Sequence, residues 1–264
     1  MDAIDNLKRS ILEEYDRLDK KDSFKFACHP GVSCYNDCCA DVNIFLTPYD
    51  IIRMKNHLGI SSKEFLAKYT LTPIDKSQRY PVVIMKMADN ETKSCQFVSE
   101  KGCTIYSDRP WPCRMYPLGL ASPSEGSVDE EFYFLMKEDI CKGFAESNEW
   151  TVEEWLEDQE INIYNEMGDL FKQITLHPTF ESGKDLSPEK IEMFHLVCYN
   201  IDKFRQFIFD SSFLQKFEVD SETLERIRKD DVELFKFGVE WIKFCIFGER
   251  TMKINREATR GTKS

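Results

Sequence analysis

Cysteine is the residue type whose number and spacing in this sequence point most directly to chemistry. Eight of the ten cysteines lie within the first 141 residues, beside turn-forming residues such as Pro30, Gly31 and Gly102. Deprotonated thiols bind zinc and iron strongly, and a bound metal can supply folding energy that a loop-rich region lacks. We therefore predict that these cysteines bind metal, rather than forming disulfides, carrying out thiol redox chemistry or filling a core. The predicted ligands are Cys28, Cys34, Cys38, Cys39, Cys95, Cys103, Cys113 and Cys141.

The spacing of these cysteines does not by itself select the metal. Tetrahedral thiolate sites suit zinc and iron–sulfur clusters alike, so eight ligands could make two four-coordinate zinc sites, or one four-iron cluster with thiols to spare. Cys38 and Cys39 are consecutive, and the side chains of consecutive residues usually point apart. This pair fits two metal atoms more easily than one, which favours a polynuclear centre or two adjacent sites.

The two remaining cysteines and the histidine near the cluster are expected to have other roles. Cys198 and Cys245 fall at helical spacing among apolar residues, and a buried thiol behaves as a small apolar side chain, so we expect both in the core. His29 follows the first predicted ligand and could bind metal, but a single histidine in a loop is more often simply exposed. The predicted ligand set therefore consists of thiols.

Two arginines, Arg109 and Arg114, flank the seventh predicted ligand. They could offset the negative charge of a thiolate-bound centre, lower the pKa of its thiols, or present a cationic surface to an anionic substrate. Alternatively, they bind loop carbonyls or acidic neighbours such as Asp108. The nearby aromatic residues Trp111 and Tyr116 are expected to pack around the site.

The charge balance argues against a nucleic-acid partner. The formal net charge is −12, whereas binding to phosphate backbones needs concentrated Lys and Arg. Most of the excess lies in residues 125–160, which hold 13 acidic and 2 basic side chains and form either a solvated surface or an interface for a basic protein partner. No apolar run has the length of a signal peptide core or a membrane span, so we expect a cytoplasmic protein without membrane contact.

Several enzyme classes are excluded by the positions of glycine and histidine. The glycines never come closer than the seven-residue step from Gly119 to Gly126, so a P-loop, a dinucleotide-binding fingerprint and a nucleophile elbow cannot be written. The four histidines are too far apart for HExxH and similar helical zinc sites. Whether the protein is an enzyme stays open at this point.

Turn and cap signals divide the chain into a cysteine-bearing part and a helical part. Thr47, Pro48 and Asp50 predict the start of a helix that ends at Gly59. The other expected elements are an amphipathic helix over 3–20, a helix from Ser61 to about residue 69, β-prone runs between 81 and 106 that form a small antiparallel sheet, a strand at 130–135, helices over 151–174 and 187–209, and one or two helices over 221–248. The predicted fold is α+β and mostly helical. Residues 1–145 form a cysteine-cluster metal-binding domain, and the helical residues 146–264 pack on it.

Four segments together resemble the YkgJ-type cysteine-cluster family. They are the run from Cys28 to Cys39, FLTPYDIIRMKNHLGISSKEFLAKY at 45–69, CQFVSEKGCTIYSDRPWPCRMYPL at 95–118, and CKG at 141–143. The resemblance extends from residue 24 to about residue 165, and its most specific part is Cys103-x-Ile-Tyr-x-x-Arg-Pro-x-x-Cys113-Arg-x-Tyr-Pro. The sequence departs from the compact CxxCxxCC pattern by three extra residues after Cys28 and one after Cys34.

The resemblance implies a zinc- or iron-chelating domain with eight cysteines, which match the eight predicted ligands. Members of the family also occur in flagellin lysine N-methylases, where an iron–sulfur cluster is implicated. The leading hypothesis is therefore an iron–sulfur cluster of the 4Fe-4S type with a redox or modification-related role. The alternatives are a zinc-stabilised protein-interaction module and a protein lysine N-methylase that uses S-adenosylmethionine. Each of these gives the chain a protein partner or protein substrate.

Overall fold

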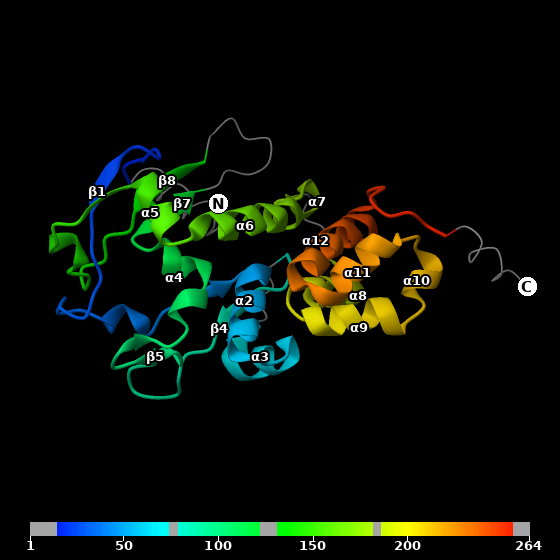
Figure 1. Ribbon diagram of the computed structural model, residues 1–264, viewed down its shortest axis with the longest axis horizontal. Helices are drawn as coiled ribbons and strands as arrows, with labels where there is room; N and C mark the ends of the chain where they lie inside the picture. The colour runs from blue at the N-terminus through cyan, green and yellow to red at the C-terminus, as the bar shows by residue number, and fades with distance from the viewer. Residues whose placement is uncertain (1–14, 74–78, 122–130, 182–185, 256–264) are drawn as a thin grey trace, which may run out of the picture. The chain divides into compact units, whose positions relative to one another are not determined.

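The structure is a computed structural model that describes residues 15–73, 79–121, 131–181 and 186–255. The described chain is α+β, as the sequence predicts, with short antiparallel strands mainly in its N-terminal part and helices in its C-terminal part (Figure 1). It forms two compact units, each assembled from separate stretches of sequence, whereas the expected division after residue 145 is a single cut along the chain. Unit 1 comprises Met1–Val42, Met87–Tyr106 and Trp111–Tyr164, and unit 2 comprises Asn43–Lys86, Ser107–Pro110 and Asn165–Ser264.

Unit 1 is built on pairs of short antiparallel strands around an aromatic-rich core. β1 (Ser23–Lys25) pairs with β9 (Glu149–Thr151), which places Phe24 opposite Trp150. The further pairs in the described part of unit 1 are β5 (Val98–Ser99) with β6 (Gly102–Cys103), and β7 (Leu118–Ala121) with β8 (Phe132–Leu135). The last of these confirms the strand expected at 130–135. The buried core consists of Phe24, Phe26, Met115, Leu118, Tyr133, Val152, Trp155, Leu156 and Ile161.

The helical segments that accompany these strands are short. They are η1 (Asp37–Cys39), η2 (Tyr106–Asp108), α4 (Trp111–Met115), η3 (Gly143–Ala145) and α5 (Val152–Asp158). Thr151 caps α5 as predicted, because its hydroxyl accepts the N–H of Glu154 while the Glu154 carboxylate accepts the N–H of Thr151. The prediction of one continuous helix over 151–174 is wrong. Glu160 has a left-handed φ of 52° and separates α5 from α6 (Ile161–Thr175).

Two further expectations are corrected by strand pairing between distant segments. Residues 1–14 lie outside the described part, and the described end of the expected helix over 3–20 is not helical, because Leu18 forms a β-bridge with Tyr133. The runs between 81 and 106 do not form one sheet. β4 (Val83–Met85) belongs to unit 2, whereas the β5–β6 hairpin belongs to unit 1.

Unit 2 begins with a small sheet and two capped helices. β4 lies between β2 (Phe45–Leu46) and β3 (Thr70–Leu71), and both pairings are antiparallel. α2 (Pro48–Leu58) starts with the predicted capping box of Thr47 and Asp50 and ends at Gly59, whose φ of 64° is left-handed. α3 (Ser62–Tyr69) is capped by the Ser61 hydroxyl, also as predicted. These signals were readable because each involves residues only three or four positions apart.

The remainder of unit 2 is helical in its described part. The helices are α7 (Pro178–Glu181), α8 (Pro188–Cys198), α9 (Ile201–Asp210), α10 (Phe213–Lys216), α11 (Ser221–Lys229) and α12 (Asp231–Ile242), followed by a π-helical turn, η4 (Lys243–Phe247). Ser187 caps α8 as expected. The expected helix over 187–209 is divided, because α8 ends at Cys198 and α9 starts at Ile201.

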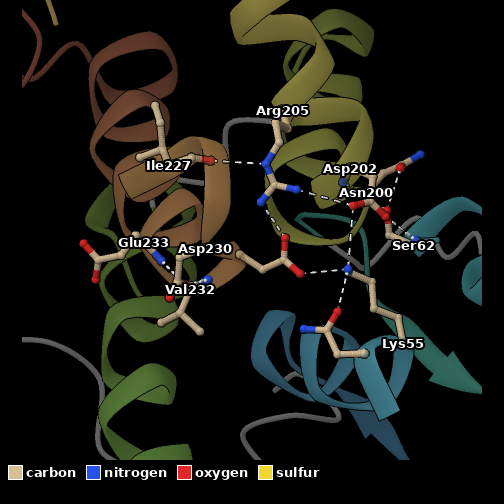
Figure 2. A network of polar contacts seen from close by, with 11 residues as sticks. Lys55, Ser62, Asn200, Asp202, Arg205, Ile227, Asp230, Val232 and Glu233 are labelled. Carbon is tan, nitrogen blue, oxygen red and sulfur yellow. Dashed lines mark hydrogen bonds and ion pairs between the residues drawn. The ribbon is translucent and has the colours of Figure 1, made fainter. Parts of the chain in front are cut away.

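A partly buried ionic network joins three helices of unit 2 (Figure 2). The Lys55 ammonium on α2 lies 2.7 Å from Asp231 Oδ2 on α12, and Arg205 Nη2 on α9 lies 2.6 Å from Asp231 Oδ1. Burial alone would raise the pKa of Asp231, but hydrogen bonds from Lys55 and Arg205 and their charges hold it below its usual value. The side chain of Lys55 is only 6% exposed, and Asp231 supplies the opposite charge beside its ammonium group.

The surface of the described residues bears on two expectations. Among these residues, no helix has both the length and the apolar character needed to cross a membrane. In the acidic stretch, residues 125–130 lie outside the described part, and carboxylates such as Glu153, Glu157 and Asp158 are exposed. The carboxylates in the described part of this stretch are therefore mostly exposed, and the choice between a solvated surface and an interface stays a prediction.

Candidate metal centre

All eight predicted ligands lie in unit 1, in turns or short elements. The thiol-bearing residues are partly accessible: Cys28, Cys38 and Cys113 are exposed, and the other five are of intermediate exposure. This distribution differs from that of core cysteines, which are normally buried. The structure separates the eight into two groups of four. Cys38 belongs to one group and Cys39 to the other, so the two groups meet at this consecutive pair.

The first group, here called the pocket group, lines a single cavity. Its four cysteines come from two segments that are far apart in the sequence, one with three of them and one with Cys141, and apolar side chains such as Phe26, Val32 and Ile140 complete the wall. Burial, followed by the charges of the other three thiols, raises the pKa of Cys28 to about 11. A bound cation would instead lower the pKa of this thiol. The pocket group is Cys28, Cys34, Cys38 and Cys141.

Backbone hydrogen bonds hold the segments of the pocket group together. The Ala27 N–H donates to Gly143 O at 3.1 Å, which places the turn containing Cys141 beside the residue before Cys28. The Lys142 N–H donates to Cys34 Sγ at 3.1 Å, across 108 positions of sequence. An N–H group directed at a thiol sulfur stabilises the thiolate that a metal requires.

The second group, here called the hairpin group, is organised by the β5–β6 hairpin. The Cys95 N–H donates to Cys39 O at 2.7 Å, and Cys103 lies opposite Val98 in the hairpin. Its members also influence one another electrostatically. Burial raises the pKa of Cys95, with a further contribution from Cys103, and the thiols of Cys113 and Cys95 contribute to the raised pKa of Cys39. The hairpin group is Cys39, Cys95, Cys103 and Cys113.

A hydrogen bond between consecutive thiols connects the two groups. The Cys39 thiol donates to the Cys38 sulfur, which lowers the pKa of Cys38 to about 7 and raises that of Cys39. Cys38 is therefore the member of the pair that carries negative charge most readily. The two thiols lie in the η1 turn, so one short segment supplies a ligand candidate to each group.

The cysteines of each group lie in one region, but their sulfur atoms do not form a coordination sphere. Among the described residues, no three Cys, His, Asp or Glu side chains converge closely enough to hold a metal ion. Rotation of thiol side chains would be part of binding, as expected where metal binding and local folding are coupled. The backbone thus brings eight thiols into unit 1, where the described side chains do not form a complete coordination sphere.

Tyr116 places a buried polar atom in the same cavity as the pocket group. Its hydroxyl oxygen is shielded from solvent and has no hydrogen-bond partner within the described part of the chain. Burial raises the pKa of this hydroxyl, and so does the Cys141 thiol, whose sulfur lies within its reach although the contact does not have the geometry of a full hydrogen bond. A buried tyrosine hydroxyl without a good acceptor could donate to the sulfur of a metal-bound thiolate. The residues present are therefore compatible with a metal–thiolate centre.

The arginine expectations are resolved in favour of a structural role for Arg114. Its guanidinium is 2% exposed, donates from Nη1 to Gln159 O at 2.8 Å and lies over the ring of Tyr164. Glu160 Oε2 lies 3.6 Å from the same Nη1. Arg114 thereby stabilises the break between α5 and α6.

The other side chains singled out in the sequence have separate surroundings. Arg109 is buried, and Asp108 accepts hydrogen bonds from Arg53 and pairs with His57 in unit 2. His29 is exposed, and its Nδ1 accepts the N–H of Gly31 at 3.1 Å.

The two cysteines outside the cluster differ from each other. Cys198 is buried, as predicted. The expectation that Cys245 is a core residue is wrong, because it lies half-buried in η4, where the helix ends. Burial nevertheless raises the pKa of its thiol to about 11.

Comparison with known protein families places this region in one of them. Residues 27–152 match the family model CxxCxxCC, described as "Putative zinc- or iron-chelating domain". The matched segment contains all eight cysteines of the two groups. No curated protein and no solved structure matches the chain.

Proposed function

Residues 27–152 of this chain belong to the CxxCxxCC family of zinc- or iron-chelating domains, and on this premise we propose that they hold an iron–sulfur cluster of the 4Fe-4S type. The pocket group supplies the ligands. The observation that carries the proposal is that four cysteines from two distant segments line one cavity. A 4Fe-4S cluster is held by four thiolates, which is the number that this cavity offers.

The surroundings of the pocket group support iron more than structural zinc. Phe26 and Val32 make the wall apolar, while Ile140 is 50% exposed at its edge. A cluster in this position lies close to solvent, where electrons can be exchanged with a partner protein. A closed structural zinc site needs no such edge. We therefore assign the centre a redox role, either in electron transfer or in support of a protein-modification reaction.

A second candidate, a zinc-stabilised protein-interaction module, is favoured by the division of the cysteines into two groups of four. Two closed zinc sites would use all eight thiols, and the hairpin group lies in the kind of short turns that surround structural zinc. In this case the exposed acidic residues of the described 131–160 segment would recruit a basic partner. The lysine N-methylase hypothesis stays a prediction from the family resemblance.

The proposal is tested by metal analysis of anaerobically purified protein. We expect roughly four iron and four sulfide per chain and a broad visible absorbance that bleaches on reduction. Cys34→Ser should lose this iron, whereas Cys103→Ser in the hairpin group and Cys198→Ala in the core should retain it. A colourless protein that contains zinc alone would refute the iron–sulfur proposal and support the second candidate.

A further inference from the structure

Tyr116 is held rigidly with its hydroxyl in the pocket. Its ring packs edge-to-face on Phe26 with 5.8 Å between centroids, and its N–H donates to Pro112 O at 3.3 Å. The hydroxyl oxygen is buried and has no partner among the described residues. Buried tyrosine hydroxyls normally have a hydrogen-bond partner, and leaving one unsatisfied costs stability. The position therefore calls for a stronger acceptor than the neutral thiol of Cys141 that lies beside it.

The atoms nearest to this hydroxyl indicate what the acceptor is. Cys141 and Cys38, both members of the pocket group, are its sulfur neighbours, and Glu138 is a nearby carboxylate that is itself exposed to water. A neutral thiol accepts hydrogen bonds weakly, whereas a thiolate or a metal-bound sulfur accepts them strongly. An ordinary tyrosine hydroxyl is protonated at neutral pH and can donate.

We infer that Tyr116 is a positioning residue that donates a hydrogen bond to the Cys141 sulfur when the pocket group holds its metal. This inference rests on the proposed function. The Lys142 N–H already donates to Cys34 Sγ, so the same pocket would then direct two donors at its sulfurs. Hydrogen bonds to sulfur stabilise the more negative, reduced state of a cluster and raise its reduction potential. Tyr116 thereby adjusts the potential without contributing a metal ligand.

Tyr116→Phe distinguishes this role from ordinary packing. Loss of the hydroxyl should not destabilise the metal-free protein, but it should disfavour the reduced cluster in the iron-loaded protein. In the metal-free protein, the substitution removes an unsatisfied buried hydroxyl, so the Tm should be unchanged or higher. In the iron-loaded protein, it removes a bond to sulfur, so the ratio of reduced to oxidised cluster at a fixed solution potential should fall roughly five- to ten-fold. A loss of Tm in the metal-free form would indicate packing alone and overturn the inference.

The control and the outcomes keep this inference distinct from the proposed function. Tyr199→Phe removes a hydroxyl that donates to Pro81 O in unit 2, and it should leave the potential unchanged. An iron-loaded Tyr116→Phe protein with the wild-type potential would overturn the inference. If the wild type contains zinc alone, the iron proposal fails. The hydrogen bond is then tested by thiol alkylation of the zinc-loaded protein, which should be faster in Tyr116→Phe, whereas equal rates would overturn the inference.

Discussion

Gly143→Ala tests how closely the two segments of the pocket group pack. A Cβ at this position would lie 2.6 Å from Ala27 O and 2.7 Å from Phe26 Cε2. The shortest ordinary carbon-to-oxygen contacts are about 3.3 Å, so the segments must separate by about 0.7 Å. The same segments are joined by the Ala27 N–H bond to Gly143 O at 3.1 Å. That separation would stretch this bond to about 3.8 Å, beyond hydrogen-bonding distance.

The expected magnitude follows from three contributions to the free energy of unfolding. Overpacking costs about 1–3 kcal/mol and the lost hydrogen bond about 0.5–1.5 kcal/mol. Replacing glycine restricts the unfolded chain and returns about 0.4–1 kcal/mol. We therefore expect the metal-free Gly143→Ala protein to be less stable by about 2 kcal/mol. Because the separated segments carry Cys28 and Cys141, the metal content after reconstitution should also fall.

Urea unfolding followed by tryptophan fluorescence measures the first effect, and metal analysis after anaerobic reconstitution measures the second. Gly168→Ala is the matched control, since a Cβ there has no neighbour within 4 Å. In the interior of α6, this control should be stabilising by up to about 1 kcal/mol and should bind metal as the wild type does. A Gly143→Ala protein with wild-type stability and full metal content would refute the reasoning.

Three further substitutions have expected outcomes. Gly102→Ala should destabilise the β5–β6 hairpin by about 1–3 kcal/mol, because Gly102 has a φ of 106° and the new Cβ would collide with Tyr35. Urea unfolding identical to that of the wild type would contradict this expectation. Arg114→Met should lower the free energy of unfolding by about 2–3 kcal/mol by leaving a carbonyl without its donor, while metal analysis should show unchanged content. Asp231→Asn should cost about 2–3 kcal/mol at pH 7, because Lys55 loses its nearer charged partner and keeps Asp202 at 3.6 Å. The pKa of Asp231 is lowered in the folded protein, so the stability that its charge provides is present above about pH 4 and is lost as the pH falls through the lowered value. Urea unfolding at pH 7 and at pH 3 should therefore show a smaller difference in stability between the wild type and Asp231→Asn at the lower pH.

Local signals in the sequence predicted helix starts well and helix breaks poorly. Thr47 and Asp50 identify the start of α2 because a capping box involves residues three positions apart. The break at Glu160 has no glycine or proline to announce it. It is stabilised by Arg114, which is distant in sequence and reaches Gln159 O only in the folded chain. Breaks that depend on tertiary contacts of this kind cannot be read from neighbouring residues.

The candidate site shows the same division between residue type and arrangement. The thiol chemistry identifies the eight cysteines, but spacing does not divide them into groups. That division depends on hydrogen bonds such as Lys142 N–H to Cys34 Sγ, which joins positions 108 residues apart. Tyr116 was expected to pack around the site, and its ring does so. The role of its buried hydroxyl could be inferred only from the fold, which places this hydroxyl in a thiol-lined cavity.

The η1 turn explains how one segment can serve both groups. Asn36 precedes it in a left-handed conformation, with φ of 74°, and donates from its side chain to Ser99 O at 3.0 Å in the hairpin. The Cys95 N–H bond to Cys39 O adds a second attachment on the hairpin side, and the Lys142 N–H bond to Cys34 Sγ holds the pocket side. The turn is thus fixed from both sides by hydrogen bonds that involve no metal. Consecutive thiols in such a turn can belong to different groups, because these hydrogen bonds hold the backbone of the turn between the pocket and the hairpin.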